Sequence, residues 1–92
     1  MDEITRITKE LIKIESSADK PEKLREIVEY VKKELKGFEF KEYESNGIPS
    51  ILFYNDPKGL KDGFKIILNG HLDVVKGTPD QFNPVEKDGR IY

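Results

Sequence analysis

The residues best suited to chemistry lie in the stretch ILNGHLDVV, residues 67–75, which contains the only histidine of the chain, His71. Asp73 follows two positions later, so in extended backbone both side chains project to the same side and the carboxylate can hold the imidazole. An acceptor of this kind fixes the tautomer of a metal-bound histidine and raises its basicity. Gly70 would let the backbone bend close to a metal. The spacing is therefore compatible with His71 as one ligand of a metal site.

A second interpretation of His71 is structural. A histidine with an aspartate two residues away is also common as the polar end of a strand, and spacing alone favours that simpler interpretation. Three other acidic residues could serve as further ligands, namely Asp80, Glu86 and Asp88. Each lies in a predicted loop or hairpin whose turn chemistry is enough to explain it, so we expect them to be solvated turn residues.

Composition limits the classes of function. The 92 residues include 16 Lys and Arg and 18 Asp and Glu, interleaved without a basic block, so no nucleic-acid partner is expected. No apolar run is long enough to span a bilayer and the N-terminus MDEITR does not resemble a signal peptide, so we expect a cytoplasmic protein with no membrane partner. The absence of cysteine excludes disulfides and thiolate zinc ligands.

Two amphipathic helices are predicted at the N-terminus, from apolar residues spaced by three and four positions. The first covers about residues 2–15. The second follows the break ESSAD, with Asp19 as N-cap, Pro21 in its first turn and Gly37 just past its end. The expected apolar faces are Ile4, Ile7, Leu11 and Ile14 in the first helix and Leu24, Ile27, Val28, Val31 and Leu35 in the second.

Extended segments are predicted after the second helix. Alternating residues at 38–44 and an extended run at 48–55 flank the turn signal SNG, which indicates a β-hairpin. Residues 56–63 read as a surface loop. The apolar run FKIILNG, residues 64–70, is typical of a strand covered on both faces inside a larger sheet. VEKDGRIY, residues 85–92, reads as a tight hairpin with Asp88-Gly89 at its turn.

These elements predict an α/β fold with two N-terminal helices flanking a small mixed sheet. A strand buried on both faces needs neighbouring strands and covering layers, and the sequence stops one strand after the Asp88-Gly89 turn. We therefore expect residues 1–92 to be the incomplete first part of one larger α/β domain, with no second domain present.

A resemblance to a known family bears on whether His71 is a metal ligand or the polar end of a strand. ILNGHLDVV followed by FNPVEKDGRIY resembles the opening region of the zinc metallopeptidase family that includes aminoacylases, acetylornithine deacetylase, succinyl-diaminopimelate desuccinylase and glutamate carboxypeptidases. The similarity extends to IESS and PSILFYN, and covers essentially the whole chain. It implies the front portion of a three-layer zinc-peptidase-like domain, in an enzyme that hydrolyses the amide bonds of N-acyl amino acids or small peptides.

The resemblance implies roles for two residues. His71 would be a terminal ligand to one of two zinc ions, and Asp73 would orient its imidazole. The remaining metal ligands and the glutamate that accepts a proton from water follow the Asp-Gly-Arg-x-Tyr segment in the family, beyond Tyr92 of this sequence. A catalytic zinc needs about three protein ligands, so we expect the 92 residues alone to be inactive and to hold zinc weakly.

Two alternatives remain open. The chain could be a non-catalytic truncated domain that self-associates through its open sheet, since unpaired apolar edges recruit other chains, and a homo-oligomer is expected for this reason. His71 residues of two subunits could also share one metal ion.

Overall fold

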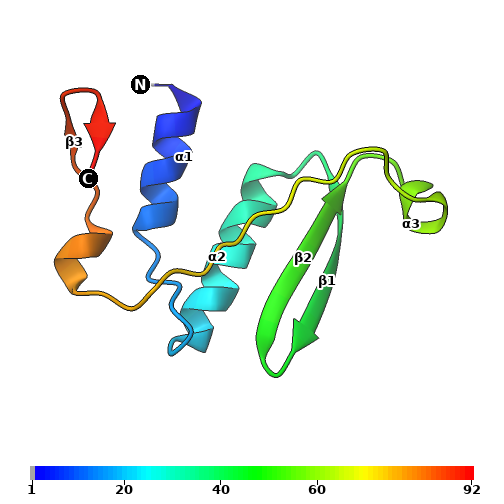
Figure 1. The fold of residues 1–92 in the computed structure, drawn as a ribbon, viewed down its shortest axis with the longest axis horizontal. Coiled ribbons are helices and arrows are strands. Elements are labelled where there is room, and N and C mark those ends of the chain that lie inside the picture. Colours follow the sequence, from blue (N-terminus) through cyan, green and yellow to red (C-terminus); the bar gives the residue numbers. More distant parts are fainter. Residues whose placement is uncertain (1) are drawn as a thin grey trace.

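The computed structural model describes residues 2–92 and shows a flat molecule of 45 × 33 × 19 Å. Its elements are α1 (Glu3–Ile12), α2 (Pro21–Glu34), β1 (Glu39–Ser45), β2 (Ile48–Tyr54), α3 (Gly59–Asp62), the 3₁₀ helix η1 (Pro79–Phe82), β3 (Glu86–Lys87) and β4 (Arg90–Ile91). Across the view of Figure 1, the β3–β4 hairpin, α1, α2 and the β1–β2 hairpin lie side by side, and an extended segment after α3 crosses α2. No helix within residues 2–92 has the length and apolar character needed to cross a membrane.

Helix α1 begins where predicted, because the Asp2 carboxylate accepts a hydrogen bond of 2.7 Å from the backbone N–H of Thr5. The helix ends at Ile12, three residues earlier than expected. Its apolar stripe is covered only toward the C-terminal end: Ile14, just past the helix, is buried, whereas Ile4 is 79% exposed. The predicted helix is thus confirmed, with a smaller buried face than the pattern indicated.

Helix α2 is confirmed, but its predicted N-cap is wrong. Lys20 occupies the cap position without a side-chain cap hydrogen bond, and Pro21 is the first helical residue. Asp19 instead accepts a hydrogen bond of 2.5 Å from the Ser17 hydroxyl. Because proline has no N–H, the first turn has one fewer donor for a cap to satisfy. The helix ends at Glu34, and Gly37 lies beyond its C-cap.

The predicted β1–β2 hairpin is confirmed. Its antiparallel register pairs Ser45 with Ile48, leaving Asn46 and Gly47 as a two-residue turn with φ angles of 53° and 79°. Asn-Gly favours this left-handed turn, whose twist matches that of the strands. Strand β2 packs against α2 and is partly buried, whereas β1 is exposed along its length. Strand β2 is therefore the part of the hairpin that covers the core.

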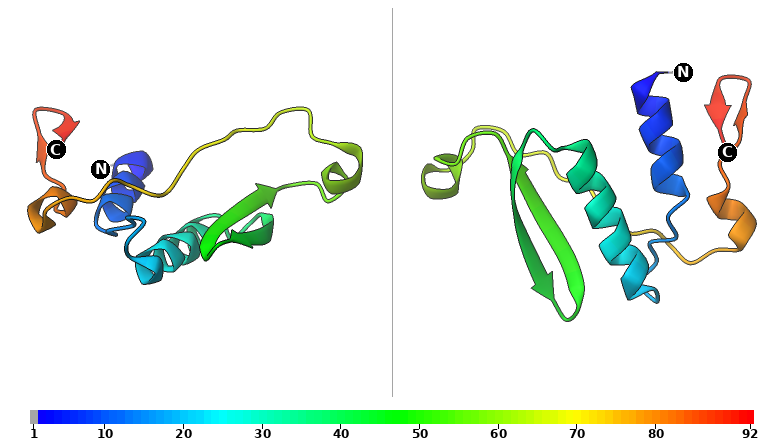
Figure 2. Two further views of the ribbon diagram at one scale, coloured as in Figure 1. Left: turned by 60° about the horizontal axis from the view of Figure 1, so that its bottom comes forward. Right: turned by 180° about the vertical axis from the view of Figure 1, so that it is seen from behind.

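The prediction of a buried strand at residues 64–70 is wrong. This segment is extended, but it pairs with no strand in the part of the chain that the structure describes. Ile66, Ile67 and Leu68 are 80%, 69% and 92% exposed, and the left view of Figure 2 shows the segment standing apart from α2 and β2. Its composition suits a central strand, but forming such a strand requires neighbours that residues 2–92 do not bring to it.

The sheet structure consequently differs from the expected small mixed sheet. The described residues form two separate antiparallel pairs, β1 with β2 and β3 with β4. The second pair confirms the predicted closing hairpin, with Asp88 and Gly89 at φ angles of 53° and 73°. The predicted loop at 56–63 contains the short helix α3. The α/β class is confirmed, around a small core of Ile14, Leu24, Ile27 and Val28.

Candidate functional site

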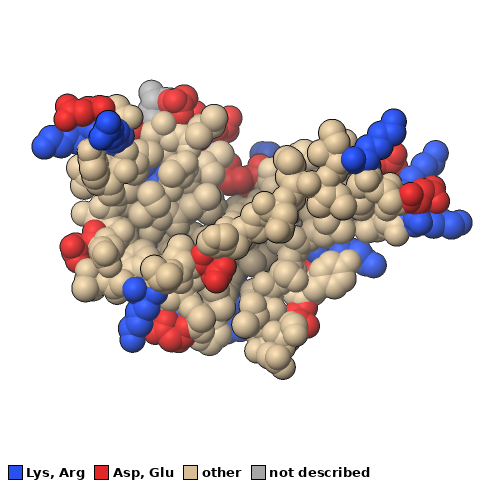
Figure 3. Space-filling view, in the orientation of Figure 1, with Lys and Arg blue, Asp and Glu red and all other residues tan. Residues whose placement is uncertain are grey.

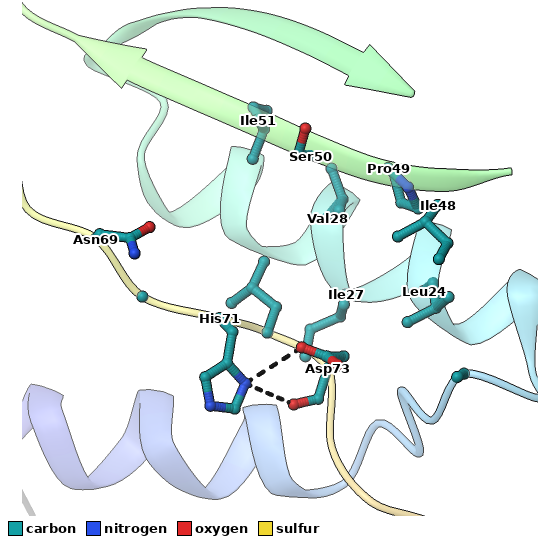
Figure 4. A pocket seen from close by; sticks show the side chains of 13 residues that line it. Leu24, Ile27, Val28, Ile48, Pro49, Ser50, Ile51, Asn69, His71 and Asp73 are labelled. Carbon is teal, nitrogen blue, oxygen red and sulfur yellow. Dashed lines mark hydrogen bonds and ion pairs between the residues drawn. The ribbon is translucent and has the colours of Figure 1, made fainter. Parts of the chain in front are cut away.

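His71 and Asp73 are in contact, as their spacing predicted. The Nδ1 atom of His71 lies 2.9 Å from the backbone carbonyl oxygen of Asp73 and 3.2 Å from its Oδ1 atom (Figure 4). Both oxygens are acceptors, so Nδ1 carries the proton of the neutral ring and Nε2 keeps its lone pair. The His71 side chain is 83% exposed. The contact leaves the Nε2 lone pair available to a metal or a hydrogen-bond donor, and the role of His71 as a ligand stays a prediction.

The turn after α1 holds the segment that carries these two residues. The Ser16 hydroxyl donates a hydrogen bond of 2.7 Å to the carbonyl oxygen of Leu72, and the N–H of Val74 donates one of 3.1 Å to the carbonyl oxygen of Ser16. Ser17 and Val74 also form a parallel bridge. Ser16 is fully buried and Ser17 nearly so. Residues 72–74 are thus anchored on both sides of the Asp73 side chain.

Ser16 and Ser17 were not predicted as positioning residues: ESSAD was interpreted as a break between helices, and IESS as part of the family resemblance. The available signal was a pair of small polar residues between two amphipathic helices. Buried backbone polar groups need partners, and a serine hydroxyl can satisfy a carbonyl where two segments cross. The pattern could have suggested a buried crossing, but it carried no information about the segment that crosses there.

Two hollows with largely apolar walls meet at the His71–Asp73 segment. One, of about 330 Å³, lies between α2, residues 48–51 of β2 and residues 69–73. The other, of about 210 Å³, lies between the C-terminal half of α1, Ile27 of α2 and residues 71–74. Figure 4 shows the side chains of Leu24, Ile27 and Val28 facing the first hollow. The only histidine therefore lies where a small molecule could approach from either side.

The described residues do not by themselves form a zinc site. Within residues 2–92 no group of three or more His, Cys, Asp or Glu side chains is close enough to hold a metal ion. Asp80 accepts a hydrogen bond from the Thr78 hydroxyl, Glu86 lies 3.9 Å from the ammonium of Lys9, and Asp88 occupies the β3–β4 turn. Since a catalytic zinc takes about three protein ligands, this arrangement supplies one oriented histidine of a possible set.

Comparison with known proteins gives one significant relative. Over 69 residues the chain is 38% identical to a succinyl-diaminopimelate desuccinylase of Nautilia profundicola. The chain is similar to a desuccinylase. The match covers 71% of this chain and 18% of that enzyme, so the chain spans less than a fifth of its relative. No family model matches the chain, and no solved structure does.

The desuccinylase is one of the enzymes that the resemblance named. Its similarity supports a relationship to hydrolases of the deacylase type. It does not extend the relationship to aminoacylases, acetylornithine deacetylase or glutamate carboxypeptidases. These remain family-level expectations from the motif.

Proposed function

We propose that this chain forms part of a zinc-dependent amide hydrolase of the desuccinylase type, in which His71 is one metal ligand. The observation that carries the proposal is the contact of His71 Nδ1 with two oxygens of Asp73, which leaves the Nε2 lone pair on the side of the ring away from Asp73. The 38% identity to a desuccinylase supports the same class of reaction. The substrate would be an N-acyl amino acid or a small peptide.

The roles of the residues follow from their contacts. Asp73 would fix the ring of His71 and increase the basicity of Nε2, while Ser16 holds the backbone on which both residues lie. The other ligands and the proton-accepting group would come from polypeptide outside residues 1–92, because the described residues offer no further ligand cluster. Residues 1–92 would then act as one part of a catalytic domain, and we propose a cytoplasmic setting for it.

A chimaera tests this function. The stretch of the Nautilia profundicola enzyme that matches would be replaced by this chain, and hydrolysis of succinyl-diaminopimelate would be measured with and without zinc. We expect zinc-dependent hydrolysis that falls by more than about a hundredfold on His71→Ala, since a lost ligand costs at least as much as a lost orienting partner.

The matched control is Asp80→Ala, because Asp80 is an exposed acid that bonds to Thr78 rather than to His71. It should leave the rate within about twofold of the unmodified chimaera, as expected for a surface substitution. An active chimaera whose rate is unchanged by His71→Ala would overturn the proposed role of His71.

A further inference from the structure

An open groove lies between strand β2 and the extended segment 64–73. A hollow of about 510 Å³ is walled on one side by residues 51–55 and on the other by Phe64 and residues 66–68. At Ile51 it continues into the hollow of about 330 Å³ beside His71. Consecutive residues line both walls, and neighbours on a strand point to opposite faces. The walls therefore present strand edges to the groove.

Both edges have free backbone groups. Strand β2 pairs only with β1 in the described residues, so its other edge has no partner strand there. Residues 64–71 neither donate nor accept a backbone–backbone hydrogen bond within residues 2–92. Such edges are templates for pairing with another extended chain. The groove thus suits a β-strand inserted between its two walls.

The walls also specify the character of that strand, because no residue that lines the hollow of about 510 Å³ is charged. In Figure 3 the face crossed by the extended segment is mostly neutral, and charged side chains gather toward the two ends of the molecule. A charged strand would lose its hydration there without gaining a partner charge. The occupant should be a short uncharged strand.

The chain itself contains such a strand. Strands β1, β3 and β4 carry charged residues, whereas residues 66–70, IILNG, are uncharged, extended and highly exposed. Strand β2 is also uncharged, but it is already held in the hairpin with β1. Residues 66–70 of a second copy therefore match the groove in charge and in backbone conformation.

We propose that two copies of this chain exchange residues 66–70, each segment entering the groove of the other copy. The strand order would be β1, β2, the partner's 66–70 segment, residues 66–70, then β2 and β1 of the partner. This arrangement fills both grooves by one twofold operation and closes the assembly at two copies. It forms a six-stranded sheet in which residues 66–70 gain the neighbours on both sides that their sequence predicted.

The register is set by the segment proposed to exchange, residues 66–70, which ends before His71. Pairing residues 66–70 antiparallel with themselves places Leu68 opposite Leu68 of the partner subunit and keeps Lys65 outside the run. The two His71 residues would then be about 20 Å apart along the strands. The exchanged dimer consequently does not depend on a metal shared between these histidines.

The mass in solution tests the exchange. By light scattering, the 92-residue chain should have twice its monomer mass of 10.6 kDa at micromolar concentration, with or without a chelator. Leu68→Lys should give a monomer, because Leu68 is 92% exposed in the single copy and buried in the dimer. Val75→Lys is the matched control, since Val75 is 87% exposed and lies outside the groove walls, and it should remain dimeric.

Three outcomes of that measurement would overturn the exchange: a monomeric parent chain, a dimer that persists in Leu68→Lys, or an assembly larger than two copies. If Leu68→Lys does not fold, cross-linking decides. The chain has no cysteine, so a Leu68→Cys variant should form a disulfide dimer under mild oxidation, whereas Val75→Cys should form it at least about tenfold more slowly. Equal rates for the two variants would contradict the proposed register.

Discussion

The backbone carbonyl oxygen and the Oδ1 atom of Asp73 both face Nδ1 of His71. These contacts fix the tautomer of the ring as well as its position. A neutral imidazole has one donor and one acceptor nitrogen, so two acceptors at Nδ1 select the tautomer whose Nε2 atom can bind a metal. The arrangement is exposed and therefore not explained by core packing. Orientation by Asp73 is thus the feature that separates His71 from an ordinary surface histidine.

Asp73→Asn in the desuccinylase chimaera isolates this effect. The backbone carbonyl of residue 73 still faces Nδ1, so we expect zinc affinity to fall by about tenfold, near the lower end of the range for lost orienting partners. Competition with a chelator of known affinity would measure the change. Asp80→Asn is the control, and equal losses in the two variants would show that Asp73 has no specific effect on the metal.

Glu34 provides a pH-dependent contribution to folding. Hydrogen bonds from the Arg6 guanidinium hold the pKa of Glu34 below its usual range, and the same pair raises the pKa of Arg6. A carboxylate with a lowered folded-state pKa stabilises the fold above its unfolded pKa, and that contribution is lost as the pH falls through the folded value. The link between α1 and α2 should therefore weaken below about pH 4.

Urea unfolding between pH 7 and pH 2 would test this dependence. The loss of stability on acidification should be smaller in Glu34→Gln than in the parent chain, because glutamine does not titrate. Glu44→Gln is the control, since Glu44 is an exposed acid of β1 outside the ion pairs found within residues 2–92. An identical acid response of the parent chain and Glu34→Gln would contradict this contribution.

The contact between the two candidate site residues was predictable from their spacing, and the distant contacts that support it were not. The His71–Asp73 contact follows from a spacing of two in extended backbone. The hydrogen bond from Ser16 to Leu72 joins residues 56 positions apart, and nothing in either local sequence specifies the other. The candidate site was therefore predictable in its chemical groups but not in the support that holds them.

At the scale of elements, the hairpins were predictable because their turns carry local chemistry. Asn46-Gly47 and Asp88-Gly89 both adopt the left-handed conformations that favour these residue pairs. Residues 64–70 show the opposite case, since an apolar run becomes a strand only when other strands pair with it. The predicted cap of α2 was wrong for a different reason, because Asp19 accepts a local hydrogen bond from the Ser17 hydroxyl instead of capping the helix.

Gly47 and Gly37 allow a matched test of the β1–β2 turn. A Cβ atom would meet nothing within 4 Å at either position, but Gly47 alone has a positive φ angle, of 79°. Gly47→Ala should therefore cost about 1 kcal/mol of stability through backbone strain alone. Gly37→Ala should be close to neutral. Urea midpoints would measure both, and equal effects would contradict the left-handed turn as the cause.

At the scale of the whole molecule, a small core coexists with a large exposed apolar surface. Four hydrophobic side chains are buried among the described residues, while Ile66, Ile67 and Leu68 are largely exposed on the face that borders the groove. Apolar surface of this kind marks an interaction site. The proposed strand exchange and the proposed part in a larger catalytic domain both cover this surface, by a second copy in one case and by further polypeptide in the other.

The role of His71 is tested most directly by the zinc content of the desuccinylase chimaera, measured by elemental analysis after dialysis against trace zinc. We predict that the unmodified chimaera retains zinc and that the His71→Ala variant loses at least one ion per molecule. The 92-residue chain alone should retain less than one ion per molecule, since it offers no cluster of three ligands within the described residues. Unchanged zinc content in His71→Ala would contradict the assignment of His71 as a metal ligand.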